Sequence, residues 1–143
     1  MKDGVLLINK PKGMGSTGIV SRVRKILNTR DVGHCGTLDP LAEGLLVVTV
    51  GKALKISQYL EADVKEYVTT VTLGKSTATL DAEGDFIEQK KINSFTKEDI
   101  ERVFKSFLGK TSQIPPIYSA LSKNGKRLYN YARNNERWSF INK

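Results

Sequence analysis

The chain has 143 residues, a length typical of one domain that is large enough to bury a hydrophobic core. Its 23 lysines and arginines exceed its 15 aspartates and glutamates, and the net charge of +8 favours a polyanionic partner, although a basic protein of another kind would show the same excess. A single cysteine excludes an internal disulfide, and no apolar run approaches the roughly 20 residues that cross a bilayer, so we expect a cytoplasmic protein.

The start of the chain predicts a buried strand, a loop and a basic helix. Residues 5–8 form a short apolar run, and the proline and glycines of residues 10–16 predict a loop after it. Apolar side chains then recur at helical spacing through residues 16–27. Ser16 or Thr17 is expected to cap this helix, because a hydroxyl can accept a bond from an unpaired amide of the first turn.

The middle of the chain predicts two further strands. Residues 28–41 are polar and contain glycines, which predicts a loop, whereas the β-branched run of residues 45–50 predicts a buried strand. A short helix is expected over residues 53–60. Threonine and valine alternate over residues 66–73, which predicts a strand, and the polar residues 74–84 predict a loop.

The last part of the chain predicts an amphipathic helix and a hairpin. Residues 96–108 carry apolar side chains at helical spacing, with Thr96 and Asp99 resembling a capping box and Gly109 expected to end the helix. The Asn-Gly pair at residues 124–125 is a strong hairpin signal. Strands and helices are mixed without a strict β-α-β rhythm, so the pattern favours an α+β fold.

Asp39 is the main candidate for a catalytic residue. It lies in the loop predicted between the basic helix and the second buried strand, and loops on rigid scaffolds often hold catalytic residues. An aspartate acts as a nucleophile or a general base according to its surroundings. Pro40 biases Asp39 toward an extended conformation, so its carboxylate is presented stiffly. Taken alone, the pair is also explained by an Asp-Pro turn or a helix cap.

Residues 33–46 resemble the active-site motif of the TruB family of pseudouridine synthases, G-H-x-G-x-L-D-P-x-A-x-G-x-L. Four further segments resemble family motifs in the family's order. Residues 4–14 resemble its opening G-x-L-x-x-x-K-P-x-G, and residues 65–74 its K-x-Y…L-G segment. Residues 113–120 and 124–133 resemble its Q-x-P-P-x-Y-S-A and G-x-x-L-Y-x-Y-A-R segments.

The resemblance implies a specific fold and reaction. The family has a mixed, largely antiparallel sheet flanked by helices, and it converts a uridine in the T-loop of tRNA (position 55) to pseudouridine without a cofactor or metal. Asp39 matches its catalytic aspartate, which starts to break the glycosidic bond. Tyr67 matches a tyrosine that stacks on the target base, His34 a histidine beside the flipped nucleotide, and Asp81 an acidic residue expected to support the active-site network.

The chemistry agrees with these residue types. Flipping a uridine out of a folded loop costs a few kcal/mol, and an aromatic platform returns on the order of 1–3 kcal/mol per stacked base. Basic side chains are expected to hold the RNA backbone. The candidates are Lys10, Arg22, Arg24, Lys25, Lys123, Lys126 and Arg127.

Each candidate also has a simpler interpretation. Tyr67 on an alternating strand is more often a core aromatic, and a lone histidine such as His34 is more often structural or solvated. No metal site is expected, because the chain has one histidine and no ligand spacing. Cys35 next to His34 suggests a thiol nucleophile, but neighbouring residues on an extended chain point apart.

Three departures from the family pattern affect the interpretation. The family's Lys-Gly-Thr-Tyr-Ile-Arg segment, whose arginine pairs with the catalytic aspartate, is not among these residues, so the sheet is expected to be incomplete at the C-terminus. Residues 1–133 are taken as the N-terminal portion of the catalytic domain and residues 134–143 as an atypical tail. Ala78 stands where the family usually has an aspartate.

Three interpretations are therefore open: two functions and a chain without function. The first is a tRNA pseudouridine synthase, with weak or no turnover expected from these 143 residues alone. The second is a catalytically impaired fragment that still binds the tRNA T-arm or helps the RNA to fold. The third is a fragment that folds poorly. The sequence does not determine the oligomeric state.

Overall fold

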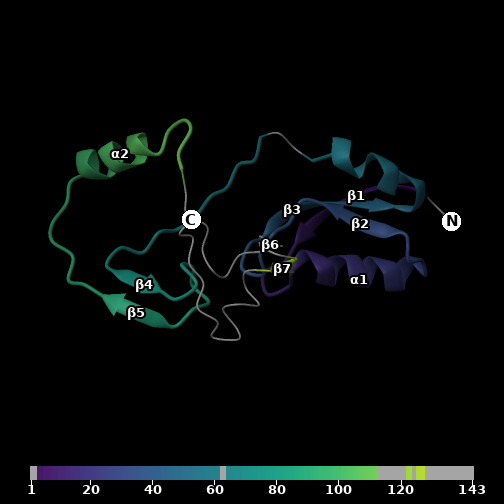
Figure 1. Cartoon of the computed structure of the whole chain (residues 1–143), viewed down its shortest axis with the longest axis horizontal. Helices are drawn as coiled ribbons and strands as arrows, with labels where there is room; N and C mark the ends of the chain where they lie inside the picture. Colours follow the sequence, from purple (N-terminus) through teal and green to yellow (C-terminus); the bar gives the residue numbers. More distant parts are fainter. Residues whose placement is uncertain (1–2, 62–63, 113–121, 124, 128–143) are drawn as a thin grey trace. The chain divides into compact units, whose positions relative to one another are not determined.

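The computed structural model describes residues 3–61, 64–112, 122–123 and 125–127 (Figure 1). Residue contacts divide the chain into two compact units, residues 1–69 and residues 70–143. Each unit combines strands and helices, which confirms the predicted α+β class. No helix in the described ranges is long and apolar enough to cross a membrane.

The first unit is built on a three-stranded antiparallel sheet in the order β1-β3-β2 (Figure 1). Its strands are β1 (Gly4–Lys10), β2 (Val32–Cys35) and β3 (Gly44–Val50). Lys10 of β1 lies opposite Gly44 of β3, and His34 of β2 lies opposite Val48. The strands predicted from the two apolar runs are confirmed as β1 and β3.

The strand β2 contradicts the loop predicted over residues 28–41. Its four residues include a glycine and a histidine, so they lack the apolar alternation that marks a strand. The strand forms because β3 supplies its hydrogen-bonding partner. Gly33 also suits this place, because a Cβ there would lie 2.7 Å from Cδ2 of Leu54.

The helix α1 (Ser16–Leu27) packs on one face of this sheet, and the hydrophobic core lies between the helix and the sheet. The apolar stripe predicted from helical spacing is confirmed. The predicted cap is wrong, because Gly15 is the N-cap residue and no side chain caps the helix. The core consists of seven buried side chains: Ile19, Val20, Val23, Val32, Leu46, Val48 and Val50.

The 3₁₀ helix η1 (Gly51–Tyr59) covers part of the opposite face of the sheet. The hydroxyls of Thr49 on β3 and Ser57 on η1 lie 2.9 Å apart, and the Gly51 amide donates to the carbonyl of Asp31 at 2.8 Å. The sequence predicts a helix over residues 53–60. The segment is helical, but it begins two residues earlier and has the tighter 3₁₀ winding.

The second unit contains a short hairpin, a helix and a two-residue strand pair. β4 (Lys75–Thr77) pairs antiparallel with β5 (Phe86–Gln89), and β6 (Ser122–Lys123) pairs with β7 (Lys126–Arg127). The hairpin predicted at residues 124–125 is thereby confirmed. The loop predicted over residues 74–84 is only partly right, because β4 occupies its start.

The helix α2 (Lys97–Ser106) confirms the prediction made from its capping box and apolar spacing. Thr96 accepts a bond from the amide of Asp99, and the carboxylate of Asp99 accepts one from the amide of Thr96. The helix ends at Ser106, before the Gly109 expected to terminate it.

The strand predicted over residues 66–73 is wrong. Residues 64–72 have no regular secondary structure, and Tyr67 and Val68 are 64% and 99% exposed. Alternation of β-branched residues makes a strand only where a second strand offers its backbone, and no described strand pairs with this segment.

Candidate active site

Asp39 lies in the connection between β2 and β3, which joins the two strands outside the core. Gly36, with φ +103°, turns the chain directly after β2 in a conformation that side chains rarely adopt. Asp39 itself is exposed. Among the described residues its carboxylate makes no ion pair or hydrogen bond, so it is open to an incoming ligand.

Hydrogen bonds hold the backbone on both sides of Asp39. The Ser16 hydroxyl donates to the carbonyl of Leu38 at 3.1 Å and accepts from the amide of Leu38 at 2.9 Å. The amide of Gly13 donates to the carbonyl of Pro40 at 2.7 Å. The residues before and after Asp39 are thus both attached to the segment between β1 and α1.

Lys10 stabilises that segment from inside the fold. It is fully buried, and its ammonium donates to the carbonyls of Pro11 at 3.0 Å and Met14 at 2.6 Å. A buried ammonium is tolerated when such acceptors replace water. Its burial contradicts the expectation that Lys10 contacts the RNA backbone, because a phosphate at the protein surface does not reach a fully buried ammonium.

His34 lies close to Asp39 in the chain and faces the core side of the sheet. It lies directly opposite Val48, a core residue, and directly opposed residues point to the same face. Its Nδ1 is 2.5 Å from the carbonyl oxygen of Gly36. A carbonyl only accepts, so Nδ1 carries the proton and Nε2 is an acceptor when the ring is neutral.

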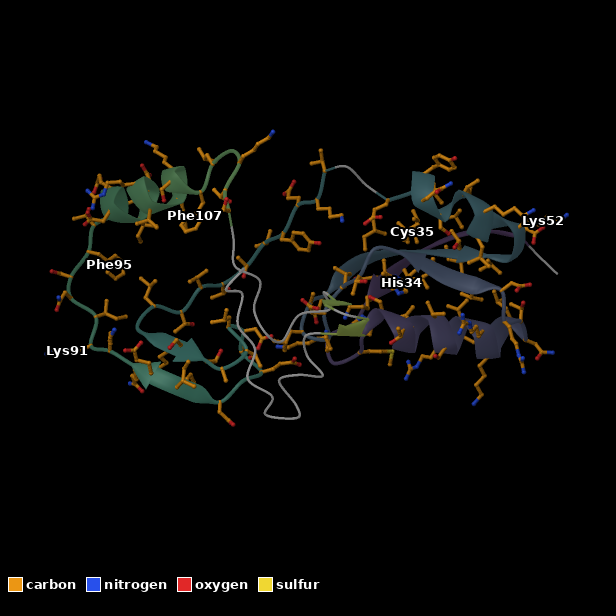
Figure 2. All side chains as sticks on the ribbon, in the orientation of Figure 1. His34, Cys35, Lys52, Lys91, Phe95 and Phe107 are labelled. Carbon is orange, nitrogen blue, oxygen red and sulfur yellow. The ribbon has the colours of Figure 1, made fainter. Side chains whose placement is uncertain are left out.

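Cys35 points to the other face of the sheet. It lies opposite Val47 rather than a core residue, and Figure 2 shows His34 on the α1 side and Cys35 on the η1 side. The alternation of a strand accounts for this separation. The two side chains therefore do not form a thiol–imidazole pair.

The basic residues of α1 differ in what they contact. Arg22 and Lys25 are exposed, whereas one guanidinium N–H group of Arg24 donates to the carbonyl of Val32 at 2.8 Å. Arg24 therefore ties the end of α1 to the start of β2. The other expected RNA contacts, Lys123, Lys126 and Arg127, belong to β6 and β7 in the second unit.

Tyr67 is 64% exposed, which contradicts the alternative that it is a core aromatic. An exposed ring keeps both a face for stacking and a hydroxyl for hydrogen bonding. No described hydrogen bond or ion pair connects Tyr67 with Asp39 or His34. The expected contact of Tyr67 with a target base stays a prediction.

Asp81 lies in the loop between β4 and β5, where it organises its own loop. Its Oδ1 accepts from the hydroxyl of Thr79 at 2.5 Å and from the amide of Glu83 at 2.9 Å, and its carbonyl accepts from the hydroxyl of Thr77 at 2.6 Å. The Thr79 hydroxyl and then the Glu83 amide lower the pKa of Asp81 from its ordinary value. Support of the active-site network by Asp81 stays a prediction.

Comparison with known proteins identifies the family. The sequence model of the TruB family pseudouridylate synthase N-terminal domain matches residues 24–141. The chain belongs to the TruB family. It is 47% identical over 138 residues to tRNA pseudouridine synthase B of Staphylococcus aureus strain MSSA476, covering 95% of this chain and 45% of that protein. It is 50% identical over 134 residues to tRNA pseudouridine synthase B of Bacillus subtilis strain 168, covering 93% of this chain and 43% of that protein.

The chain thus spans less than half the length of these TruB relatives. The family match includes Asp39, His34, Tyr67 and Asp81, because all lie within residues 24–141. In the described ranges, no group of three or more histidine, cysteine, aspartate or glutamate residues is arranged to hold a metal ion. Function without a metal or cofactor stays a prediction from the resemblance.

Sequence reasoning misses the residues that attach the Asp39 loop to the fold. Residue patterns predict a helix cap at Ser16 and an RNA contact at Lys10. Ser16 and Leu38 are 22 residues apart, so local spacing carries no sign of their pairing. The available signal is a proline- and glycine-rich segment between a strand and a helix, which predicts a loop but not its partner.

Proposed function

We propose that this chain is the N-terminal part of a catalytic domain that isomerises uridine to pseudouridine in the T-loop of tRNA, at position 55. Residues 1–133 form this part and residues 134–143 a tail, the location is cytoplasmic, and no cofactor takes part. TruB membership and the names of the relatives support the reaction. The main structural observation is an exposed Asp39 on a loop whose backbone is fixed on both sides.

The reaction needs a carboxylate that can approach a nucleotide released from its stack. The N1–C1′ bond of uridine breaks, the uracil turns, and a C5–C1′ bond forms while the C5 proton leaves and N1 takes up a proton. Positive charge develops on the sugar as the first bond breaks, and a nearby carboxylate stabilises it. Asp39 is exposed and has no competing cation among the described residues, so it is available for this role.

Two side chains are proposed to hold the flipped base. Tyr67 offers an exposed ring for stacking, which offsets the cost of removing the base from the RNA. Nδ1 of His34 bonds Gly36, and none of the described residues bonds its Nε2, so the ring can accept a hydrogen bond from a nucleotide. Both contacts are proposed from the family match together with the exposure of Tyr67 and the hydrogen bond of His34.

Charge supports an RNA partner. Arg22 and Lys25 are exposed on α1, and the whole chain carries a net charge of +8. Such side chains bind phosphates and release counterions, so the affinity for tRNA should fall steeply with salt.

The decisive experiment measures hydrogen release from uracil C5 of a tRNA labelled at that position. We expect the Asp39→Asn variant to lose at least about a hundredfold in rate, because the amide can neither attack nor accept a proton. The matched control is Asp31→Asn, which changes another exposed aspartate of the same unit and should keep the wild-type rate. Equal rates for wild type and Asp39→Asn would refute the catalytic role.

A second candidate function is binding of the tRNA T-arm without turnover. The observation that favours it is that Asp39 makes no ion pair among the described residues. In the family pattern the matching aspartate pairs with an arginine. In that case the wild-type chain releases no C5 hydrogen, yet it binds tRNA with a steep salt dependence or speeds tRNA refolding. Turnover that depends on Asp39 would exclude this candidate as the main function.

A further inference from the structure

We propose that Ser16 is a positioning residue for the reaction, and that its hydroxyl orients Asp39 by holding both peptide groups of Leu38. This inference rests on the proposed function. It concerns a residue that touches neither the substrate nor the reacting atoms, so it acts only through the backbone that carries Asp39.

The geometry of the Ser16–Leu38 pair supports this role. Oγ of Ser16 accepts from the Leu38 amide at 2.9 Å and donates to the Leu38 carbonyl at 3.1 Å. The amide belongs to the peptide group before Leu38, and the carbonyl belongs to the peptide group that contains the nitrogen of Asp39. One hydroxyl therefore fixes the two consecutive peptide planes that lead into the catalytic aspartate.

The chain after Asp39 is restricted as well. The Gly13 amide holds the carbonyl of Pro40 at 2.7 Å, and the Ala42 amide donates to the carbonyl of Asp39 at 3.1 Å. The proline ring fixes φ of its own residue. The backbone after Asp39 is therefore held. The orientation of the Asp39 side chain then depends on what fixes the peptide group between Leu38 and Asp39, and the bond from Ser16 to the Leu38 carbonyl is one such contact.

The environment of Ser16 makes these bonds effective. Ser16 is 3% exposed, so water does not readily replace its hydroxyl. It is the first residue of α1, directly after the N-cap residue Gly15, and its side chain makes no capping hydrogen bond. The hydroxyl serves the distant loop instead of its own helix.

Loss of the hydroxyl should disturb orientation rather than folding. The side chain of Leu38 packs against the core, so an apolar contact keeps the loop near its place without Ser16. The amide of Leu38 would lose its acceptor and the carbonyl its donor, and both groups would turn toward water or other partners. A change in kcat is therefore expected, with little change in substrate binding.

The test compares Ser16→Ala with Ser21→Ala in the full chain. Ser21 lies on the same helix and is exposed, and within the described part of the chain its hydroxyl bonds the carbonyl of Thr17 alone, at 3.0 Å. Hydrogen exchange of the Leu38 amide, followed by NMR, should speed up by about tenfold or more in Ser16→Ala and stay unchanged in Ser21→Ala. C5-hydrogen release should show a kcat lower by about tenfold or more in Ser16→Ala, with KM within about twofold.

A Ser16→Thr variant tests whether the hydroxyl itself is required. It keeps the donor and acceptor, and it should recover most of the protection of the Leu38 amide and most of the kcat lost in Ser16→Ala. Unchanged exchange at Leu38 in Ser16→Ala, or a kcat no lower than that of Ser21→Ala, would overturn the inference.

The exchange measurement separates this inference from the proposed function. If the Leu38 amide responds as expected but no variant or wild-type chain releases C5 hydrogen, the hydrogen bonds are real and the proposed turnover fails. A positioning role in the reaction then fails with it. If turnover is present and depends on Asp39 but not on Ser16, only the positioning role of Ser16 is refuted.

Discussion

Residues 16–50 bury seven apolar side chains between a helix and a sheet, whereas none of residues 70–112 is buried. In the second unit the apolar face of α2 is exposed to solvent, and so are the apolar residues that follow the helix. Phe104 is 63% exposed and Leu108 is 76% exposed. Both regions nevertheless form a helix where local signals predict one, α1 in the first and α2 in the second. Local chemistry is therefore enough to place these helices, whereas a loop is held against a distant partner only where a core supports it.

The two acidic loops illustrate the same difference. The loop of Asp39 is attached to residues 13 and 16, and these belong to a segment anchored by the buried Lys10. The loop of Asp81 is held by bonds within residues 77–85. The carboxylate of Asp39 has no bond to any residue that the structure describes and lies on a loop attached to a core, which suits catalysis, whereas the carboxylate of Asp81 is bonded within its own loop.

The first prediction tests whether the buried core stabilises the first unit, as its contrast with the second unit implies. Leu46→Ala should lower the free energy of opening measured by hydrogen exchange of the β3 amides by about 2–5 kcal/mol, because it leaves a cavity at a side chain that is 2% exposed. Leu108→Ala, at an exposed position, should change the stability of either unit by less than about 0.5 kcal/mol. Similar effects from the two changes would contradict the contrast.

A smaller effect tests whether α2 depends on local signals. Thr96→Ala removes the hydroxyl that accepts from Asp99 and should destabilise α2 by about 1 kcal/mol, measured by exchange of its own amides. The amides of β1 and β3 serve as the internal control and should keep their protection. A loss of protection in β3 as well would show that the stability of the first unit depends on α2, which would contradict the contrast.

The smallest effect concerns pH at the β4–β5 loop. Hydrogen bonds from Thr79 and from the Glu83 amide lower the pKa of Asp81 in the folded loop, so the loop gains stability wherever the unfolded carboxyl is ionised. This contribution is complete well above the ordinary value of 3.8 and is lost as the pH falls through the lower folded pKa. NMR shifts of the Glu83 amide should follow this titration in wild type and lose it in Asp81→Asn, with the Ala78 amide as a probe of loop opening.

Much of the fold is predictable because its signals are local. The apolar runs of β1 and β3, the helical stripe of α1, the capping box of α2 and the Asn-Gly turn all act within a few residues. The resemblance of residues 33–46 to a family motif likewise identifies Asp39 as the main candidate from the sequence alone.

The remaining features depend on partners far away in the chain. β2 exists because β3 pairs with it, and residues 66–73 fail to form a strand although their alternation is better. The neighbours of Ser16 in the sequence suggest a helix cap, but in the fold its hydroxyl bonds the backbone of Leu38, 22 residues away. Those of Lys10 suggest an RNA contact, but its ammonium is buried and bonds the carbonyl of Met14.

Residue patterns thus specify most of the elements and the candidate aspartate, whereas contacts between distant segments fix how that aspartate is held. The physical reason is that caps, turns and apolar periodicity act between near neighbours in the chain. Strand pairing and burial instead depend on which segments meet in space, and residue spacing does not reveal this.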